Sequence, residues 1–209
     1  GIVEESSDSR FKKGDSVIVT GYDLGMNTSG GFGQYIRVPA DWLVHLPEGL
    51  NLKESMIFGT AGFTAALSVY ALQKFGINPA KGEIVVTGST GGVGSVSVAL
   101  LANLGFSVVA STGKIEEKLF LTGLGAFEII HREELNNDSK KALYKERWAG
   151  AIDTVGGITI ATLLKSTKRG GAVAATGLVD SPELSMTVFP FILRGIGLLG
   201  IILVKLLLV

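Results

Sequence analysis

The sequence predicts an α/β protein with a doubly wound parallel sheet, joined to part of a smaller β domain. Two patterns of apolar residues along the chain support this prediction. After residue 82, short apolar runs alternate with segments of helical periodicity, a pattern typical of a parallel sheet covered by helices on both faces. Residues 1–54 contain short apolar runs broken by Gly, Pro and Asp, which is typical of small antiparallel β structure.

The expected elements follow one another in a regular order. Apolar residues recur at helical spacing through residues 54–76, and Gly76 with Pro79 should end this helix. The runs that we expect to form strands are residues 83–88, 106–112, 126–131, 149–156 and 170–178. Further helices are expected at residues 92–105, 115–125, 139–148 and 158–167.

Composition argues against several classes of protein. Lys and Arg total 19, as do Asp and Glu, so bulk charge gives no reason to expect a nucleic acid or an acidic membrane as partner. Cysteine is absent, which excludes disulfides and thiolate metal sites. The two histidines, His45 and His131, are far apart in the sequence, so we expect no zinc site and no other metal site. The lack of cysteine and of a signal-peptide pattern fits a cytoplasmic protein.

The C-terminal part is unusually apolar. Its longest run without a charged residue, 195–204, lies between Arg194 and Lys205 and is too short to span a bilayer. We therefore expect a buried or interface strand there. Because a sheet edge can be covered by a second copy, a homodimer through residues 195–202 is expected.

Three glycines spaced three apart follow the strand at 83–88 and open the next helix. Gly88 can supply a tight turn, Gly91 (helped by Gly92) allows a pyrophosphate to approach the backbone, and Gly94 allows the helix to pack closely on the strand. The helix N-terminus would add N–H donors and a partial positive charge. Since strand, loop, helix and second strand come in the required order, the segment predicts dinucleotide binding rather than a merely structural turn.

The end of the second strand indicates which dinucleotide is bound. An NAD-selective site has an Asp or Glu about twenty residues after the glycines, where it contacts the ribose hydroxyls. This chain has no acid there and instead offers Ser111, Thr112 and Lys114, which favour the 2′-phosphate of NADPH. Arg132, after the third strand, could add a second cation. Lys114 and Arg132 could also be ordinary surface residues.

Other chemistries with similar loops fit less well. Short-chain dehydrogenases need a Tyr-x-x-x-Lys pair after the glycine loop, whereas Tyr70 and Lys74 come before it. The chain has no Gly-x-Ser-x-Gly elbow, and Ser95 follows Gly94 where an NTPase would have lysine. The remaining candidate chemistry is hydride transfer without a metal, a reaction in which the protein orients the cofactor.

Several long motifs resemble one family. "RFKKGDSVIVTG", "GTAGFTA", "EIVVTGSTGGVGS", "WAGAIDTVGG" and "VFPFILRGIGLLGI" are similar to segments of the zinc-independent medium-chain dehydrogenases/reductases, in particular the YhdH-type group of acryloyl-CoA reductases and quinone oxidoreductases. The resemblance implies a partial GroES-like catalytic domain at residues 1–54, an NADP-binding Rossmann domain at 55–202, and a tail at 203–209 that does not match the family.

The resemblance also implies roles for individual residues. Those expected to contact the pyrophosphate are Thr90, Gly91, Gly92 and Val93. Those expected around the 2′-phosphate are Thr112, Gly113 and Lys114, with Arg132 near the adenosine end. Leu178 and Ile192 would line the nicotinamide side, and Thr64 would face the same pocket unless it is a helix-capping or buried hydroxyl.

The implied activity is reduction of the C=C bond of an α,β-unsaturated acyl thioester such as acryloyl-CoA, with NADPH as cofactor. The N-terminal catalytic segment of the family and much of the C-terminal catalytic part have no counterpart here, so we expect a partial reductase and assign no catalytic residue. A quinone or enone reductase, and an NADPH-binding protein without turnover, stay open as alternatives.

Overall fold

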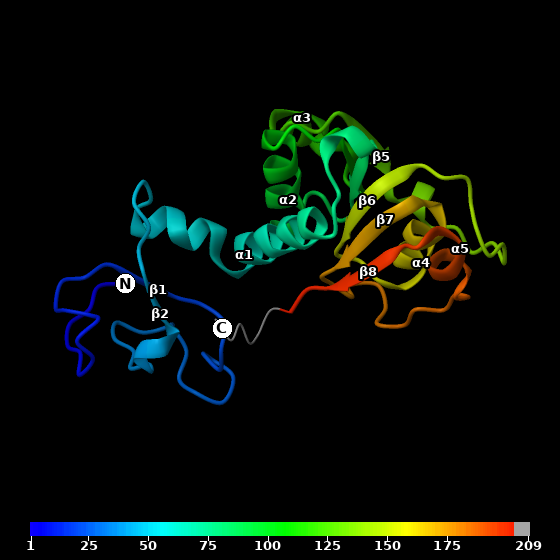
Figure 1. Cartoon of the computed structure of the whole chain (residues 1–209). Coiled ribbons are helices and arrows are strands. Elements are labelled where there is room, and N and C mark those ends of the chain that lie inside the picture. Colours follow the sequence, from blue (N-terminus) through cyan, green and yellow to red (C-terminus); the bar gives the residue numbers. More distant parts are fainter. Residues whose placement is uncertain (203–209) are drawn as a thin grey trace. The chain divides into compact units, whose positions relative to one another are not determined.

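The computed structural model describes residues 1–202, and the expected tail at 203–209 lies outside them (Figure 1). The chain divides into two compact units, with residues Gly1–Thr60 in the first and Ala61–Ile201 in the second. The boundary between them falls within α1 (Leu52–Lys74), whose helical geometry is interrupted at Gly59, with φ 48° and ψ −149°. By length and composition α1 could cross a membrane, but its residues Val69 and Leu72 are buried in the core of the second unit.

The first unit is built on a small antiparallel pair. β1 (Val17–Val19) pairs with β2 (Leu43–His45) in the register Val17↔His45, and the 3-10 helix η1 (Ala40–Trp42) directly precedes β2. Val3, Phe11 and Val17 form a small core, against which Ala40 and Leu43 pack. The small antiparallel β structure expected within residues 1–54 is therefore present.

The second unit contains a six-stranded sheet in which every neighbouring pair is parallel. The order is β5-β4-β3-β6-β7-β8, which is the arrangement of a doubly wound sheet. The strands are β3 (Ile84–Val86), β4 (Val108–Thr112), β5 (Glu128–His131), β6 (Trp148–Asp153), β7 (Thr167–Ala175) and β8 (Gly197–Gly200). The five predicted strands and the apolar C-terminal strand are all confirmed.

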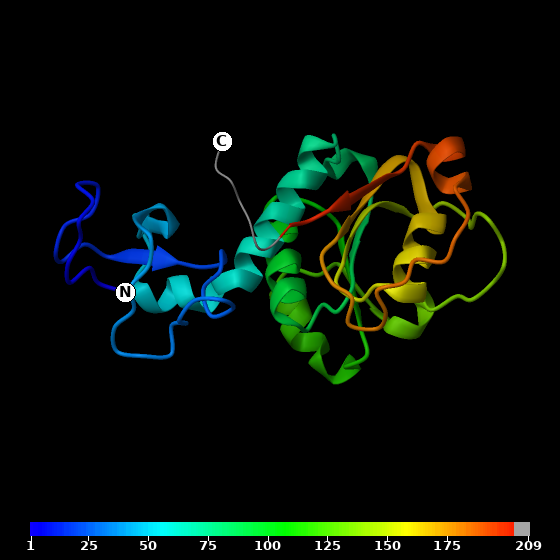
Figure 2. The ribbon, with the colours of Figure 1, turned by 90° about the horizontal axis from the view of Figure 1, so that it is seen from below.

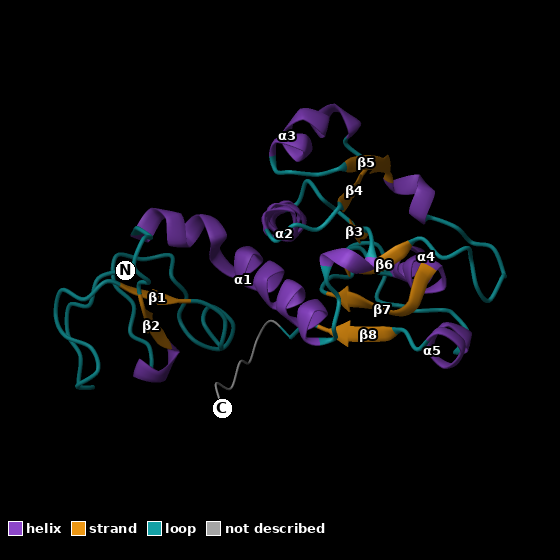
Figure 3. Ribbon diagram, turned by 45° about the horizontal axis from the view of Figure 1, so that its top comes forward, coloured by secondary structure: helices purple, strands orange, loops and turns teal. Residues whose placement is uncertain are grey.

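Helices cover both faces of this sheet (Figure 3). They are α2 (Gly92–Asn103), α3 (Lys118–Gly123), α4 (Gly157–Ser166) and α5 (Phe189–Arg194), with short 3-10 turns η2 (Pro79–Lys81), η3 (Ile115–Glu117) and η4 (Arg132–Leu135). Ile84 and Val86 pack with α1, α2 and α3 on one face, whereas Val85 packs with α4 on the other. Burial on both faces explains why the strands are continuously apolar.

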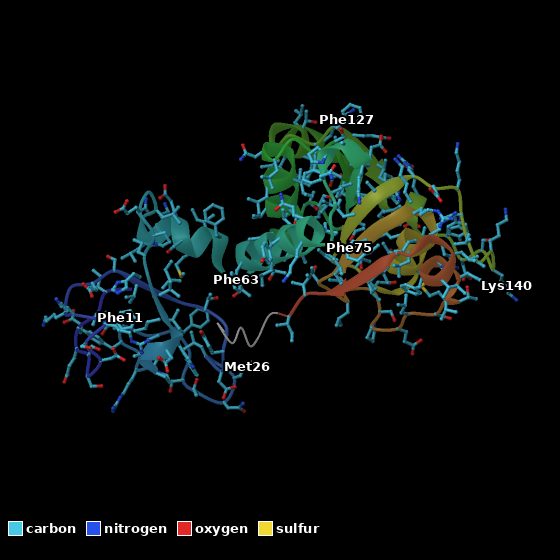
Figure 4. All side chains as sticks on the ribbon, in the orientation of Figure 1. Phe11, Met26, Phe63, Phe75, Phe127 and Lys140 are labelled. Atoms are coloured by element: carbon cyan, nitrogen blue, oxygen red, sulfur yellow. The ribbon has the colours of Figure 1, made fainter. Side chains whose placement is uncertain are left out.

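β8 lies at one edge of the sheet, and the end of α1 packs against it. The ring of Phe75, labelled in Figure 4, lies so close to Gly197 that a Cβ on this glycine would come within 2.6 Å of ring carbon Cε2. The small residue in β8 therefore makes room for the aromatic ring of Phe75, which directly follows α1.

The prediction of a helix at residues 139–148 is wrong. The segment runs as an irregular loop up to Trp148, where β6 begins (Figure 2). Its backbone donors bond to distant residues instead: the Tyr144 N–H donates to the Lys165 carbonyl at 2.9 Å and the Arg147 N–H to the Ser166 carbonyl at 2.8 Å. The Arg194 guanidinium in turn donates to the Tyr144 carbonyl. Tertiary hydrogen bonds thus replace the helical ones that local propensity favours.

Candidate functional site

The loop between β3 and α2 is shaped by two glycines that no other residue could replace without strain. Gly88 has φ 58°, and a Cβ there would collide with the Thr154 hydroxyl. A Cβ on Gly94 would lie 2.7 Å from the Gly88 carbonyl carbon and 2.8 Å from the Ser89 Cα, so the first turn of α2 packs directly on the loop. The tight turn and the close packing predicted from the sequence are both present.

The N-terminus of α2 is open to a ligand. Gly91 occupies the N-cap position without a side-chain hydrogen bond, and the first helical bond runs from the Ser95 N–H to the Gly91 carbonyl at 2.8 Å. The preceding N–H groups of Gly92 and Val93 have no partner within the helix, as at any helix start. Such a helix end attracts phosphate oxygens.

A cleft of about 660 Å³ opens beside this loop, at the carboxyl ends of β3, β4 and β6. This edge contains the point where the strand order reverses, which is where open α/β sheets bind ligands. Seven of the residues proposed from the sequence as cofactor contacts line the cleft: Thr90, Gly91, Ser111, Thr112, Gly113, Lys114 and Arg132. Glu133 and Asn136 also line it, and so do residues of the loops after β6 and β7.

Hydroxyl groups and cations gather at the β4 end of the cleft. The hydroxyls of Thr90 and Thr112 lie 3.3 Å apart, and the Lys114 N–H donates to the Thr112 hydroxyl at 3.0 Å. The Arg132 side chain crosses beside Gly113, where a Cβ would come within 3.0 Å of Cδ and Nε. Two chain segments that are distant in sequence therefore present Lys114 and Arg132 to the same cleft.

A buried polar network joins the strands at the other end of the cleft. The Thr87 hydroxyl donates to Asp153 Oδ1 at 2.7 Å and accepts the Thr154 N–H at 2.9 Å, while the Gly156 N–H donates to Asp153 Oδ2 at 2.8 Å. Asp153 is fully buried. Burial raises the pKa of Asp153 above its ordinary value, and the hydrogen bonds from Thr87 and Gly156 partly oppose this shift.

This network, and Glu133 as a lining residue, were not predicted from the sequence. The available signal for Asp153 was a single acid at the end of the otherwise apolar strand "AGAID". For Glu133 the available signal was its position next to Arg132, because nothing in the sequence shows that it lines the cleft.

Five proposed residues do not line the cleft: Thr64, Gly92, Val93, Leu178 and Ile192. Gly92 and Val93 open α2 beside it. Thr64 is buried in α1, whereas Leu178 and Ile192 are largely exposed. Val179 and Asp180, which follow Leu178, line the cleft instead. The cofactor contacts of these five residues stay predictions.

The pair expected in a short-chain dehydrogenase is not part of this site. Tyr70 and Lys74 both lie on α1, and neither lines the cleft. The order of elements already argued against that class, and the geometry agrees with the argument.

The chain is similar in sequence to a family of dehydrogenases and to individual oxidoreductases. The sequence profile of the family described as zinc-binding dehydrogenases matches residues 92–206, more than half of the chain. The putative quinone oxidoreductase YhfP of Bacillus subtilis is 52% identical over 96% of this chain and 61% of its own length. The acrylyl-CoA reductase AcuI of Ruegeria pomeroyi is 51% identical over the same shares. The chain thus spans about 61% of the length of these curated relatives.

Solved structures show the same likeness. The crystal structure of Bacillus subtilis YhfP with NAD bound has a TM-score of 0.96 and 51% identity, covering 99% of this chain and 63% of that one. The structure of Escherichia coli K-12 YhdH with bound NADPH has a TM-score of 0.94 and 48% identity, covering 98% and 62%.

Although the family is described as zinc-binding, residues 1–202 of this chain contain no set of side chains that could bind zinc. No group of three or more His, Cys, Asp or Glu side chains in this range could hold a metal ion, and the whole sequence has no cysteine. On the family match and the close relatives together, the chain belongs to the zinc-binding dehydrogenase family and resembles its YhdH-type oxidoreductases.

Proposed function

We propose that this chain is the cofactor-binding part of an NADPH-dependent, metal-free reductase. In the whole protein, the proposed reaction is reduction of the C=C bond of an α,β-unsaturated acyl thioester such as acryloyl-CoA. The likeness to an acrylyl-CoA reductase and to a structure with bound NADPH supports this substrate class and cofactor. Residues 1–54 would belong to a GroES-like catalytic domain and residues 55–202 to the NADP-binding Rossmann domain.

The observation that carries the proposal is the chemistry of the cleft at the end of β4. Thr112 and Lys114 stand where an NAD-selective site has a carboxylate, and Arg132 reaches the same place from the end of β5. A 2′-phosphate needs hydroxyl donors and cations, which this set provides. The lack of a Cβ at Gly91 and the open start of α2 suit the pyrophosphate.

The residues of this chain would hold and orient the cofactor. Thr90, Gly91, Gly92 and Val93 would bind the pyrophosphate, and Thr112, Gly113, Lys114 and Arg132 the adenosine end. Leu178 and Ile192, with Thr64, would contact the nicotinamide side. NADPH, when bound, supplies the hydride that reduces the β-carbon of such a double bond. The proton donor and the groups that polarise the thioester carbonyl are assigned to no residue of this chain.

Titration of the chain with NADPH and with NADH, followed by nicotinamide fluorescence, tests the cofactor. We expect tighter binding of NADPH, and Lys114→Ala and Arg132→Ala should each weaken it roughly tenfold by removing a charged hydrogen-bond donor. Lys118→Ala is the matched control, since Lys118 starts α3 and does not line the cleft. Comparable affinity for both dinucleotides would overturn this proposal.

A quinone is the second candidate acceptor, because the Bacillus subtilis relative is named a putative quinone oxidoreductase. NADPH oxidation by the full-length protein with acryloyl-CoA, compared with a panel of quinones, separates the two. Oxidation with the quinones alone would replace the thioester proposal. NADPH binding without oxidation by any acceptor would support a protein without turnover.

A homodimer is proposed through β8, with the cytoplasm as its compartment. β8 is an edge strand of the parallel sheet, and such an edge can pair with a second copy. Light scattering on the purified chain tests this, and a monomer at micromolar concentration would contradict it.

A further inference from the structure

A carboxylate lies in the cleft beside the cations that are proposed to bind the 2′-phosphate. Glu133, in η4, lines the cleft. Its Oε1 is 3.5 Å from Arg132 Nε, and its Oε2 accepts a hydrogen bond from Asn136 Nδ2 at 3.2 Å. The Glu133 N–H also donates to His131 Nδ1 at 3.4 Å. The backbone and both carboxylate oxygens are thus held by neighbouring residues.

Arg132 connects this carboxylate to the end of β4. Its side chain passes beside Gly113, within 3.0 Å of the position a Cβ would take. Within residues 1–202, the ion pair that Arg132 forms is the one with Glu133. Any anion that binds Arg132 at the end of β4 must therefore share the guanidinium with Glu133 and come close to its negative charge.

Resting on the proposed NADPH site, we propose that Glu133 is a specificity-determining residue that limits the preference for NADPH over NADH. Its carboxylate competes with the 2′-phosphate for Arg132 and repels it. The ribose hydroxyls of NADH carry no charge and are affected far less. Both side chains are more than half exposed, at 72% for Arg132 and 59% for Glu133, so solvent screening keeps the effect moderate.

The neighbouring Glu134 provides a matched control. It has the same charge and follows Glu133 directly, but its carboxylate is directed to Arg147 Nη1 at 3.8 Å and does not line the cleft. Replacing either glutamate by glutamine removes one negative charge and keeps the size of the side chain. Only the change at position 133 alters the cleft itself.

The experiment uses the adenosine half of the cofactor, so that its outcome does not depend on reductase activity. Calorimetric titrations of the wild-type chain, Glu133→Gln and Glu134→Gln with 2′,5′-ADP and with 5′-AMP compare binding with and without the 2′-phosphate. We expect Glu133→Gln to strengthen 2′,5′-ADP binding about three- to tenfold, as expected for a nearby charge in partly screened surroundings. Binding of 5′-AMP should change less than about twofold, and the gain should shrink at high salt.

The outcomes separate this inference from the proposed cofactor. Equal gains for both nucleotides, or gains no larger than those of Glu134→Gln, would overturn the role of Glu133 and leave the NADPH site standing. If the wild-type chain lacks a preference for 2′,5′-ADP but Glu133→Gln acquires one, the role of Glu133 stands and the NADPH preference of the natural chain falls. If no variant binds either nucleotide, both are wrong.

Discussion

The close packing of α2 on the glycine loop makes Gly94→Ala the most informative single substitution. The added methyl group would meet the Gly88 carbonyl oxygen and carbon and the Ser89 Cα, all of which are backbone atoms. A flexible side chain could rotate away from such a contact, but backbone atoms can yield only if the loop moves. The loop is anchored by the Ser89 N–H, which donates to the Ser111 carbonyl of β4 at 3.1 Å.

The magnitude follows from two opposing effects. Alanine improves helix propensity over glycine by about 1 kcal/mol. Inserting a methyl group into a packed site that cannot relax costs typically about 1–3 kcal/mol, or more where the contacts are shorter than van der Waals distances. Because the contacts at Gly94 are very short, the cost should lie at or above the upper end of this range, which leaves a net loss of about 2 kcal/mol or more in the free energy of unfolding. A displaced loop should also weaken dinucleotide binding.

Gly123→Ala is the matched control. Gly123 ends α3, and a Cβ there would have no heavy atom within 4 Å. The same change should leave the free energy of unfolding unaltered or raise it by up to about 1 kcal/mol. Urea denaturation of both variants, followed by circular dichroism, measures the two effects side by side. If Gly94→Ala is as stable as Gly123→Ala and binds NADPH like the wild type, the packing argument is wrong.

Substitutions at three further positions test other features of the fold by urea denaturation. Ser97→Ala should be neutral or stabilising by up to about 1 kcal/mol, because the buried Ser97 hydroxyl has no hydrogen-bond partner among the described residues; a clear loss would reveal a partner. Arg194→Ala should lower the free energy of unfolding by about 2–4 kcal/mol, since three backbone carbonyls lose their charged donor. Arg194→Lys should lower it nearly as much, because one ammonium group cannot reach all three carbonyls. Asp153→Asn should change the pH dependence, because the folded pKa of Asp153 is raised. The free energy of unfolding of the wild type should fall as pH rises from the ordinary Asp pKa of about 3.9 through the raised pKa of the folded state. The variant has no carboxyl group at this position and should not show this fall, so the stability of Asp153→Asn relative to the wild type should increase over that pH range. A difference in free energy of unfolding that does not change with pH would contradict this.

The strands and the glycine loop were predictable because their causes are local. Ile84–Val86 is buried on both faces and has only apolar residues, and the spacing of Gly88, Gly91 and Gly94 follows from turn and packing geometry within one segment. The order of the strands allowed Arg132 to lie at the cleft, since the carboxyl ends of parallel strands share one edge of the sheet, but only the family resemblance favoured this position over an ordinary surface one.

The failures have the opposite cause, because they depend on residues that are distant in sequence. The segment at 139–148 has helical propensity, but the partners that hold it in a loop are Lys165, Ser166 and Arg194. Likewise, only the folded sheet brings Thr87 to Asp153, which are 66 residues apart. A single sequence without long-range contact information contains no signal for either pairing.

The two ends of the cleft differ in how freely they can change. At the β3 and β6 end, Asp153 is buried and its hydrogen bonds join neighbouring strands, so a substitution there must cost stability. At the β4 and β5 end, Arg132 and Glu133 are mostly exposed, and their ion pair contributes little to folding. Substitutions at Arg132 and Glu133, the residues proposed to set selectivity between NADPH and NADH, should therefore have little effect on folding. The proposed selectivity residues of this chain thus lie at the exposed end of the cleft, whereas the buried network around Asp153 holds the strands at the other end.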